Sequence, residues 1–155
     1  MNIKEAVSLH RFGLVTSEQI VSAAIESLAN DDSETLLMLA SEVDKQMHII
    51  EPLLYSYSEE SGLAKLTLQD HSIIASKYFI KLYELGQFDE ESLGFKIGTV
   101  CNYEEAPSVL REIYLTALAH DECATEFGYP SDWQSYRNTC LEDIRKLVAN
   151  VHENT

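Results

Sequence analysis

The stretch Thr67–Gly86, TLQDHSIIASKYFIKLYELG, decides the fold class. Thr67 and Asp70 suit the start of a helix, because short polar side chains there can satisfy backbone N–H groups that lack a partner within the helix. The apolar residues that follow recur at the three- or four-residue spacing of one helix face: Ile74, Tyr78, Leu82 and Leu85. Gly86 then ends the pattern. The stretch predicts a long amphipathic helix.

Most of the chain repeats this order of cap, apolar stripe and break. Only 6 Gly and 3 Pro occur, and alternating β-branched runs are scarce, which favours helices. A first helix is expected over residues 3–11, ended by Gly13, and a second from a capping box at Thr16 and Gln19 to residue 28, with Ile25 facing inward. Shorter helices are expected from Asp31 and Glu34 to residue 40 and from Asp89 to residue 97. Two long helices follow, one from Pro107 to before Gly128 and one from Ser131 to residue 151, with Tyr136 and Cys140 in its apolar stripe.

Residues 41–62 are harder to interpret. Ser41 and Asp44 could cap a helix that continues to Ile50. Pro52 then either kinks this helix or begins a new one, since proline lacks the N–H that the helix interior uses. A break at Pro52 is preferred, followed by a short helix that carries Tyr57. Together these patterns predict an all-α fold of about seven to eight helices, an irregular bundle or stacked helical hairpins, in a single domain over residues 1–155.

Charge is the unusual feature of the composition. Asp and Glu total 26 and Lys and Arg total 11, a net charge of −15, in a chain whose 45% hydrophobic content is ordinary for a globular protein. Such an excess repels nucleic acid and anionic membrane, whose phosphates require cationic groups, and attracts basic partners. The alternative is that the acidity serves solubility alone.

The cysteines and the hydropathy pattern suggest a cytoplasmic protein. Cys101, Cys123 and Cys140 are far apart and odd in number, which argues against a disulfide framework and favours reduced, buried thiols. The N-terminal residues lack the apolar stretch of a signal peptide, and no run approaches the roughly 20 apolar residues of a membrane span.

The sequence predicts no metal, no cofactor and no enzymatic activity. None of the five histidines has an acidic residue three positions before it, the spacing of di-iron bundles, and no two lie four apart. Cys123 lies three residues after His120, a spacing that could activate a thiolate but more often marks a small buried side chain. His120-Asp121 resembles the His-Asp pair of helical metal-dependent phosphohydrolases. That resemblance would add His71 and Asp143 as ligands.

Acidic residues cluster at the expected helix starts and turns, and tyrosines lie among them. Part of this pattern is helix chemistry, because carboxylates favour helix N-termini. Where several turns converge, their fields add and attract a cationic partner, and tyrosine is a favoured interface anchor, although it also seals the rims of helical cores. One acidic cluster is Asp31, Asp32 and Glu34. The candidate partner-binding residues are Tyr55, Tyr57, Glu59, Glu60, Asp89, Glu90, Glu91, Tyr103, Glu104, Glu105, Asp121, Glu122, Glu126 and Tyr129.

Two segments carry a family resemblance: Phe12–Val21, FGLVTSEQIV, and Phe127–Trp133, FGYPSDW. Together they resemble small acidic helical proteins of bacteria, some uncharacterised and some the immunity proteins of contact-dependent toxin systems. The resemblance implies a non-enzymatic protein that occludes the cleft of a basic toxin, possible targets including nucleases. The alternatives are the metal-dependent phosphohydrolase and a structural or adaptor module.

Overall fold

The computed structural model describes residues 1–101, 106–126 and 130–154, without the side chains of residues 123–126, 130–133 and 152–154. Over this part of the chain every regular element is helical, which confirms the all-α prediction of seven to eight helices. The elements are α1 (Ile3–Arg11), α2 (Ser17–Ser27), α3 (Glu34–Ser41), α4 (Met47–Glu60), the 3₁₀ turn η1 (Leu63–Lys65), α5 (Leu68–Glu84), α6 (Glu90–Val100), α7 (Ser108–Glu126) and α8 (Pro130–Asn154).

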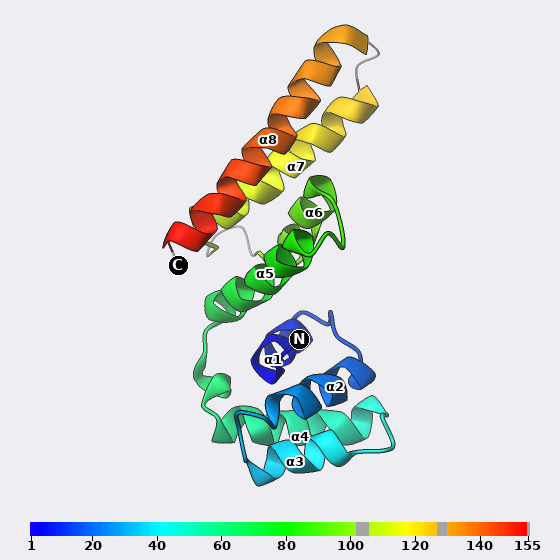
Figure 1. Ribbon diagram of the computed structural model, residues 1–155, viewed down its shortest axis with the longest axis vertical. Coiled ribbons are helices and arrows are strands. Elements are labelled where there is room, and N and C mark those ends of the chain that lie inside the picture. The colour runs from blue at the N-terminus through cyan, green and yellow to red at the C-terminus, as the bar shows by residue number, and fades with distance from the viewer. Residues whose placement is uncertain (102–105, 127–129, 155) are drawn as a thin grey trace. The chain divides into compact units, whose positions relative to one another are not determined.

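The helices form two compact units, residues 1–74 and 75–155, and α5 runs from the first into the second (Figure 1). Each unit is described by itself. That the whole chain is one domain stays a prediction.

Local signals in the sequence set most helix ends. Thr16 and Gln19 form the predicted capping box, in which each side chain accepts a backbone N–H of the other residue. Thr67 and Asp70 pair in the same way at the start of α5, and the Asp89 carboxylate caps α6 by accepting from Ser92 N. Gly86 follows α5 with a φ of 72°, a left-handed conformation that favours glycine.

Two predicted boundaries are wrong. Ser33, and not Asp31, caps α3, because the Asp31 carboxylate is engaged by the Tyr57 hydroxyl and by Ser33 N. Pro52 neither breaks nor ends a helix, since α4 continues through it to Glu60. The missing proline N–H leaves the carbonyl of His48 without its donor within the helix, and the exposure of both residues leaves that carbonyl near solvent.

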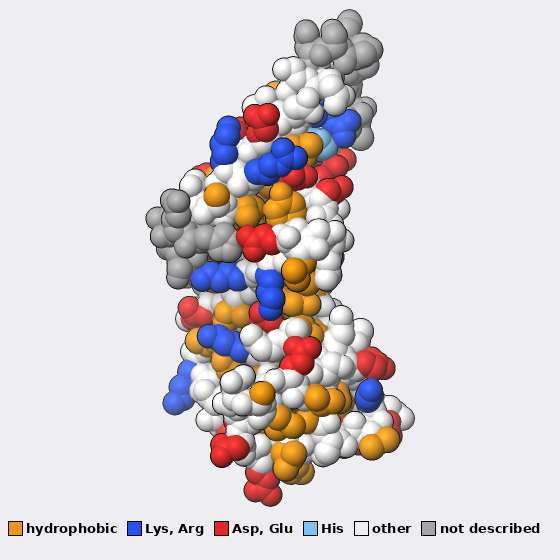
Figure 2. Space-filling model, viewed as in Figure 1, with side chains coloured by type: hydrophobic (Ala, Val, Ile, Leu, Met, Phe, Trp, Pro, Cys, Tyr) orange, Lys and Arg blue, Asp and Glu red, His pale blue; other side chains and the backbone are white. Residues whose placement is uncertain are grey.

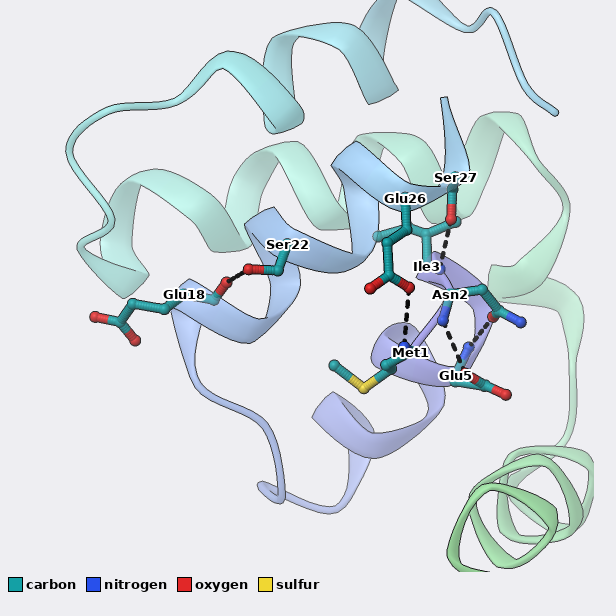
Figure 3. A network of polar contacts seen from close by, with 8 residues as sticks. All are labelled: Met1, Asn2, Ile3, Glu5, Glu18, Ser22, Glu26 and Ser27. Carbon is teal, nitrogen blue, oxygen red and sulfur yellow. Dashed lines mark hydrogen bonds and ion pairs between the residues drawn. The ribbon is translucent and has the colours of Figure 1, made fainter. Parts of the chain in front are cut away.

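In the first unit α1 to α4 enclose a core of fully buried side chains: Ile20, Leu36, Leu39, Ile50 and Leu54. Helix α1 is tied to the end of α2 by two polar contacts, shown in Figure 3. Ile3 N donates to Ser27 Oγ at 2.9 Å, and the N-terminal ammonium pairs with Glu26 at 2.9 Å. These contacts hold the start of α1. Later residues of the same helix line the cavity described below.

In the second unit α7 and α8 run antiparallel side by side, and α6 packs against α7 (Figure 1). The approach of α6 to α7 depends on glycine. A Cβ added at Gly94 would lie 2.1 Å from Ala117 Cβ, and one at Gly98 would lie 2.4 Å from the ring of Tyr114. The two glycines that weaken α6 by helix propensity therefore allow it to pack closely.

Some side chains expected in apolar stripes are exposed. Ile25 of α2, predicted to face inward, is 55% exposed, and Leu85 and Tyr136 are also largely exposed. Helical spacing locates a face but not its width, so residues at the edge of a stripe can remain outside the core. Cys101 and Cys140 are buried as predicted, and Cys123 lies outside the described side chains. In the described residues no helix is both long enough and apolar enough to span a bilayer.

Candidate functional site

The α2–α3 turn and the end of α4 bring together acidic residues that are distant in sequence. Glu60 accepts hydrogen bonds from the hydroxyls of Thr35, at 2.6 Å, and Ser33, at 3.3 Å. Asp31 accepts from the Tyr57 hydroxyl at 2.7 Å, which lowers the pKa of Asp31. Two of the predicted acidic clusters thus meet, although each of these carboxylates is satisfied by hydroxyl or backbone donors.

Of the other predicted residues of α4, Tyr57 contacts this turn through Asp31, whereas Tyr55 and Glu59 lie elsewhere. Tyr57 is buried, so it packs at the rim of the core and does not act as an exposed interface anchor. Glu59 and Tyr55, by contrast, line a cavity beside α1. The Tyr55 hydroxyl donates to Glu51, and the Tyr55 ring meets His10 edge to face.

In the second unit the acids at the start of α6 contact α7 and α8. Glu90 accepts from Arg145 Nε at 2.6 Å and from the Tyr83 hydroxyl at 3.1 Å, and Asp89 serves as the cap. Glu91 Oε1 lies 3.4 Å from Nδ1 of His120. The position of these acids is therefore explained by packing and capping.

His120 links three helices. Its Nε2 accepts a hydrogen bond from Arg137 Nε of α8 at 3.2 Å, while Nδ1 faces Glu91 of α6, at a distance and geometry that do not make a full hydrogen bond. Since Nε2 accepts, the neutral ring carries its proton on Nδ1. Asp143, another ligand of the phosphohydrolase hypothesis, pairs with Lys146 at 3.0 Å. Among the residues whose placement is described, no three His, Cys, Asp or Glu side chains form a group suited to a metal ion.

Of the remaining predicted residues, the structure describes the side chains of only two. Asp121 is half-buried and Glu122 is exposed near the end of α7. The side chains of Tyr103, Glu104, Glu105, Glu126 and Tyr129 lie outside the described residues.

The acidic excess is divided almost equally between the two units. Residues 1–74 contain 12 acidic and 4 basic residues, a balance of −8, and residues 75–155 contain 14 and 7, a balance of −7. On the face shown in Figure 2, Asp and Glu side chains lie at separate places, with Lys, Arg and hydrophobic side chains between them. Carboxylates alone therefore do not define one binding face there.

A groove between α7 and α8 combines exposed apolar side chains with acidic ones. It has a volume of about 530 Å³, and Leu115 and Tyr136, 45% and 49% exposed, line it from opposite helices. Glu112 and the Asp143–Lys146 pair also line it. The other lining residues are Thr116, Ala119, Thr139, Cys140 and Leu147. The sequence gave no reason to single out this groove, because it depends on how two helices pack.

A smaller cavity of about 170 Å³ lies in the first unit, between α1, α4, η1 and the start of α5. His71, only 1% exposed, lines it. Ser8 Oγ lies 3.0 Å from His71 Nδ1, and His71 Nε2 is buried with no hydrogen-bond partner. The direction of the Ser8–His71 hydrogen bond depends on which ring nitrogen of His71 carries the proton.

Burial of His71 predicts an acid-sensitive fold. Burial lowers its pKa, Arg11 lowers it further, and Asp70 opposes both. The unfolded chain therefore takes up a proton near the ordinary pKa of about 6.5, while the folded chain resists protonation. Stability is fully present above that pH and falls as the pH drops through it, by at most about 1.4 kcal/mol per pH unit for this one group.

Urea unfolding at pH 7.5 and pH 5.5 measures this effect. His71→Gln is expected to reduce the loss on acidification, whereas His48→Gln, at an exposed position, leaves it as in the parent chain. Equal pH dependence in the parent chain and both variants would contradict the assignment.

Comparison of the chain with protein-family models, with curated proteins and with solved structures found no match in any of the three.

Proposed function

We propose that this protein is a non-enzymatic binding protein that uses the groove between α7 and α8 to hold a basic protein partner. Following the resemblance of residues 12–21 and 127–133 to bacterial immunity proteins, the proposed partner is a basic toxin, such as a nuclease, whose cleft is occluded in the bacterial cytoplasm. The observation that carries the proposal is the exposure of Leu115 and Tyr136 in one acidic groove.

The composition of the groove supports a protein partner. Interfaces concentrate their binding energy in a few apolar and aromatic side chains at the centre, with polar groups around them, and tyrosine is enriched among these anchors. A groove between two antiparallel helices also suits a third helix, which can place its apolar ridge there.

Charge supports a basic partner. The unit that contains the groove has a net charge of −7, and the Glu112 carboxylate makes no ion pair with any described residue. Attraction between opposite charges raises the association rate, to about 10⁸ M⁻¹s⁻¹ or more at low salt in favourable cases, and it weakens as salt screens the charges.

Binding to the purified product of the adjacent gene tests the proposal. Leu115→Lys places a cation in the groove and removes an apolar anchor, so we expect the dissociation constant to rise about 30-fold or more, equivalent to about 2 kcal/mol. Surface plasmon resonance at 50 to 500 mM salt is expected to show an association rate that falls with salt. If the partner is a nuclease, one equivalent of this protein is expected to suppress its activity.

Leu68→Lys is the matched control, because Leu68 is 47% exposed, as Leu115 is, but lies on α5 outside the groove. It adds the same charge and is expected to change the dissociation constant less than threefold. Equal weakening by both variants would show that the groove has no special role, and binding that is insensitive to salt would exclude the electrostatic part of the proposal.

A second candidate function is a structural or adaptor module whose acidity serves solubility. The dispersed carboxylates in Figure 2 and the near-equal charge of the two units favour it. The two proposals differ in the salt experiment, because an adaptor that docks through apolar contacts alone keeps its association rate as salt rises.

A further inference from the structure

A buried ring nitrogen without a hydrogen-bond partner lies in the wall of the cavity in the first unit. His71 is 1% exposed and its Nε2 has no hydrogen-bond partner, although Ser8 fixes the ring through Nδ1. Native proteins rarely leave a buried polar group without a hydrogen-bond partner, because the loss of its contact with water is then not compensated.

Two side chains of opposite charge line the same cavity and are also without partners. The guanidinium of Arg11 on α1 and the carboxylate of Glu59 on α4 make no ion pair or hydrogen bond with any residue that the structure describes. Their separation therefore exceeds the 4.0 Å limit of an ion pair. A ligand that carries both charges could contact both groups, whereas a simple anion would meet the repulsion of Glu59.

The cavity is small, and the rest of its lining is apolar except for His10 and Ser58. Val7, Leu54, Leu63 and Ala64 form much of its wall, with the ring of Tyr55 beside them. Its volume of about 170 Å³ is below the roughly 300 Å³ at which pockets for drug-sized molecules begin. The ligand that fits this lining is small, with an apolar body.

We infer that this cavity binds a free α-amino acid with a small apolar side chain, its carboxylate held by Arg11 and its ammonium by Glu59. His71 lies in the wall of the same cavity. The inference is independent of the groove between α7 and α8, which lies in the other unit.

Isothermal titration of the full chain with glycine, alanine, valine and leucine tests the inference. At least one of the three with an apolar side chain is expected to bind about tenfold or more tightly than glycine. For that amino acid, the carboxylate without the amine and the amine without the carboxylate are both expected to bind at least about tenfold more weakly. For leucine these probes are 4-methylpentanoate and 3-methylbutylamine.

Variants of the two exposed charged residues locate the binding site without disturbing the core. Arg11→Gln and Glu59→Gln are each expected to weaken binding about tenfold or more. Lys4→Gln on α1 and Glu34→Gln on α3 make the same charge changes outside the cavity, and each is expected to change the affinity less than twofold. Binding is also expected to shift the nitrogen resonance of His71 Nε2 and leave that of the exposed His48 in place.

Several results would overturn the inference. Absence of binding by all four amino acids is one, and equal affinity for the carboxylate probe and the amino acid is another. A third is equal weakening by the cavity variants and their charge-matched controls, which would indicate long-range electrostatics only.

Discussion

Gly94→Ala is expected to destabilise the second unit by about 1–2 kcal/mol, although alanine is the better helix former. The new methyl group would lie 2.1 Å from Ala117 Cβ and 3.2 Å from the carbonyl oxygen of Ile113, so α6 must move away from α7. Overpacking of this kind typically costs 1–3 kcal/mol and occasionally more, and the gain in helix propensity of about 1 kcal/mol offsets only part of it. Urea unfolding followed by circular dichroism measures the loss.

Ala117→Gly provides a direct control for this prediction. Alone it lowers stability by about 1 kcal/mol, because glycine weakens the interior of α7. Combined with Gly94→Ala it removes the atom that the new methyl group meets, so the double variant is expected to be more stable than Gly94→Ala alone. If the double variant loses as much stability as the two single variants together, the close contact is contradicted.

Leu36→Ala is expected to destabilise the first unit by about 3 kcal/mol, within the 2–5 kcal/mol typical of buried leucine. Helix α3 has only eight residues, and Leu36 and Leu39 are its two fully buried side chains. Removing one of them leaves a cavity and reduces the contact that holds so short a helix. The free energy of urea unfolding measures the loss.

The neighbouring residue supplies the matched control. Leu37 is 55% exposed, and Leu37→Ala is expected to change stability by no more than about 0.5 kcal/mol. A similar loss in both variants would contradict the assignment of Leu36 to the core.

The two variants also test whether the chain is a single domain. Gly94 lies in the unit of residues 75–155 and Leu36 in the unit of residues 1–74. If the chain unfolds as one cooperative domain, each variant moves the same transition, and probes in both units report the same midpoint. Two midpoints, each moved by only one variant, would contradict the single-domain prediction.

Local patterns predicted the helical elements well. The caps at Thr16, Thr67 and Asp89 act within one turn of chain, so the residues that decide them are adjacent in sequence. Boundaries failed where a distant residue intervened. The Tyr57 hydroxyl, from α4, engages Asp31, and the next helix is capped by Ser33 instead.

The candidate sites were less predictable, because both depend on residues from different helices. The groove requires Leu115 of α7 and Tyr136 of α8 to face each other, and helical spacing alone placed Tyr136 in an apolar stripe. The cavity requires Arg11, Glu59 and His71 from three elements. Of the residues proposed for partner binding, Tyr55 and Glu59 line this cavity, and Glu60, at the end of α4, accepts hydrogen bonds from Ser33 and Thr35.

Pro52 gives α4 an uneven resistance to local opening. At the start of α4, the backbone N–H groups of Ile49 and Ile50 donate to the carbonyl of Gln46, the residue before the helix. Pro52 has no N–H to donate to the carbonyl of His48. The first turn therefore has one backbone hydrogen bond fewer, and it is also held by the buried side chain of Ile50 and by the Tyr55–Glu51 hydrogen bond, while Leu54 and Tyr57 bury the later turns. Fraying at residues 47–51 would leave the part of α4 that borders the cavity, Leu54 to Glu59, intact.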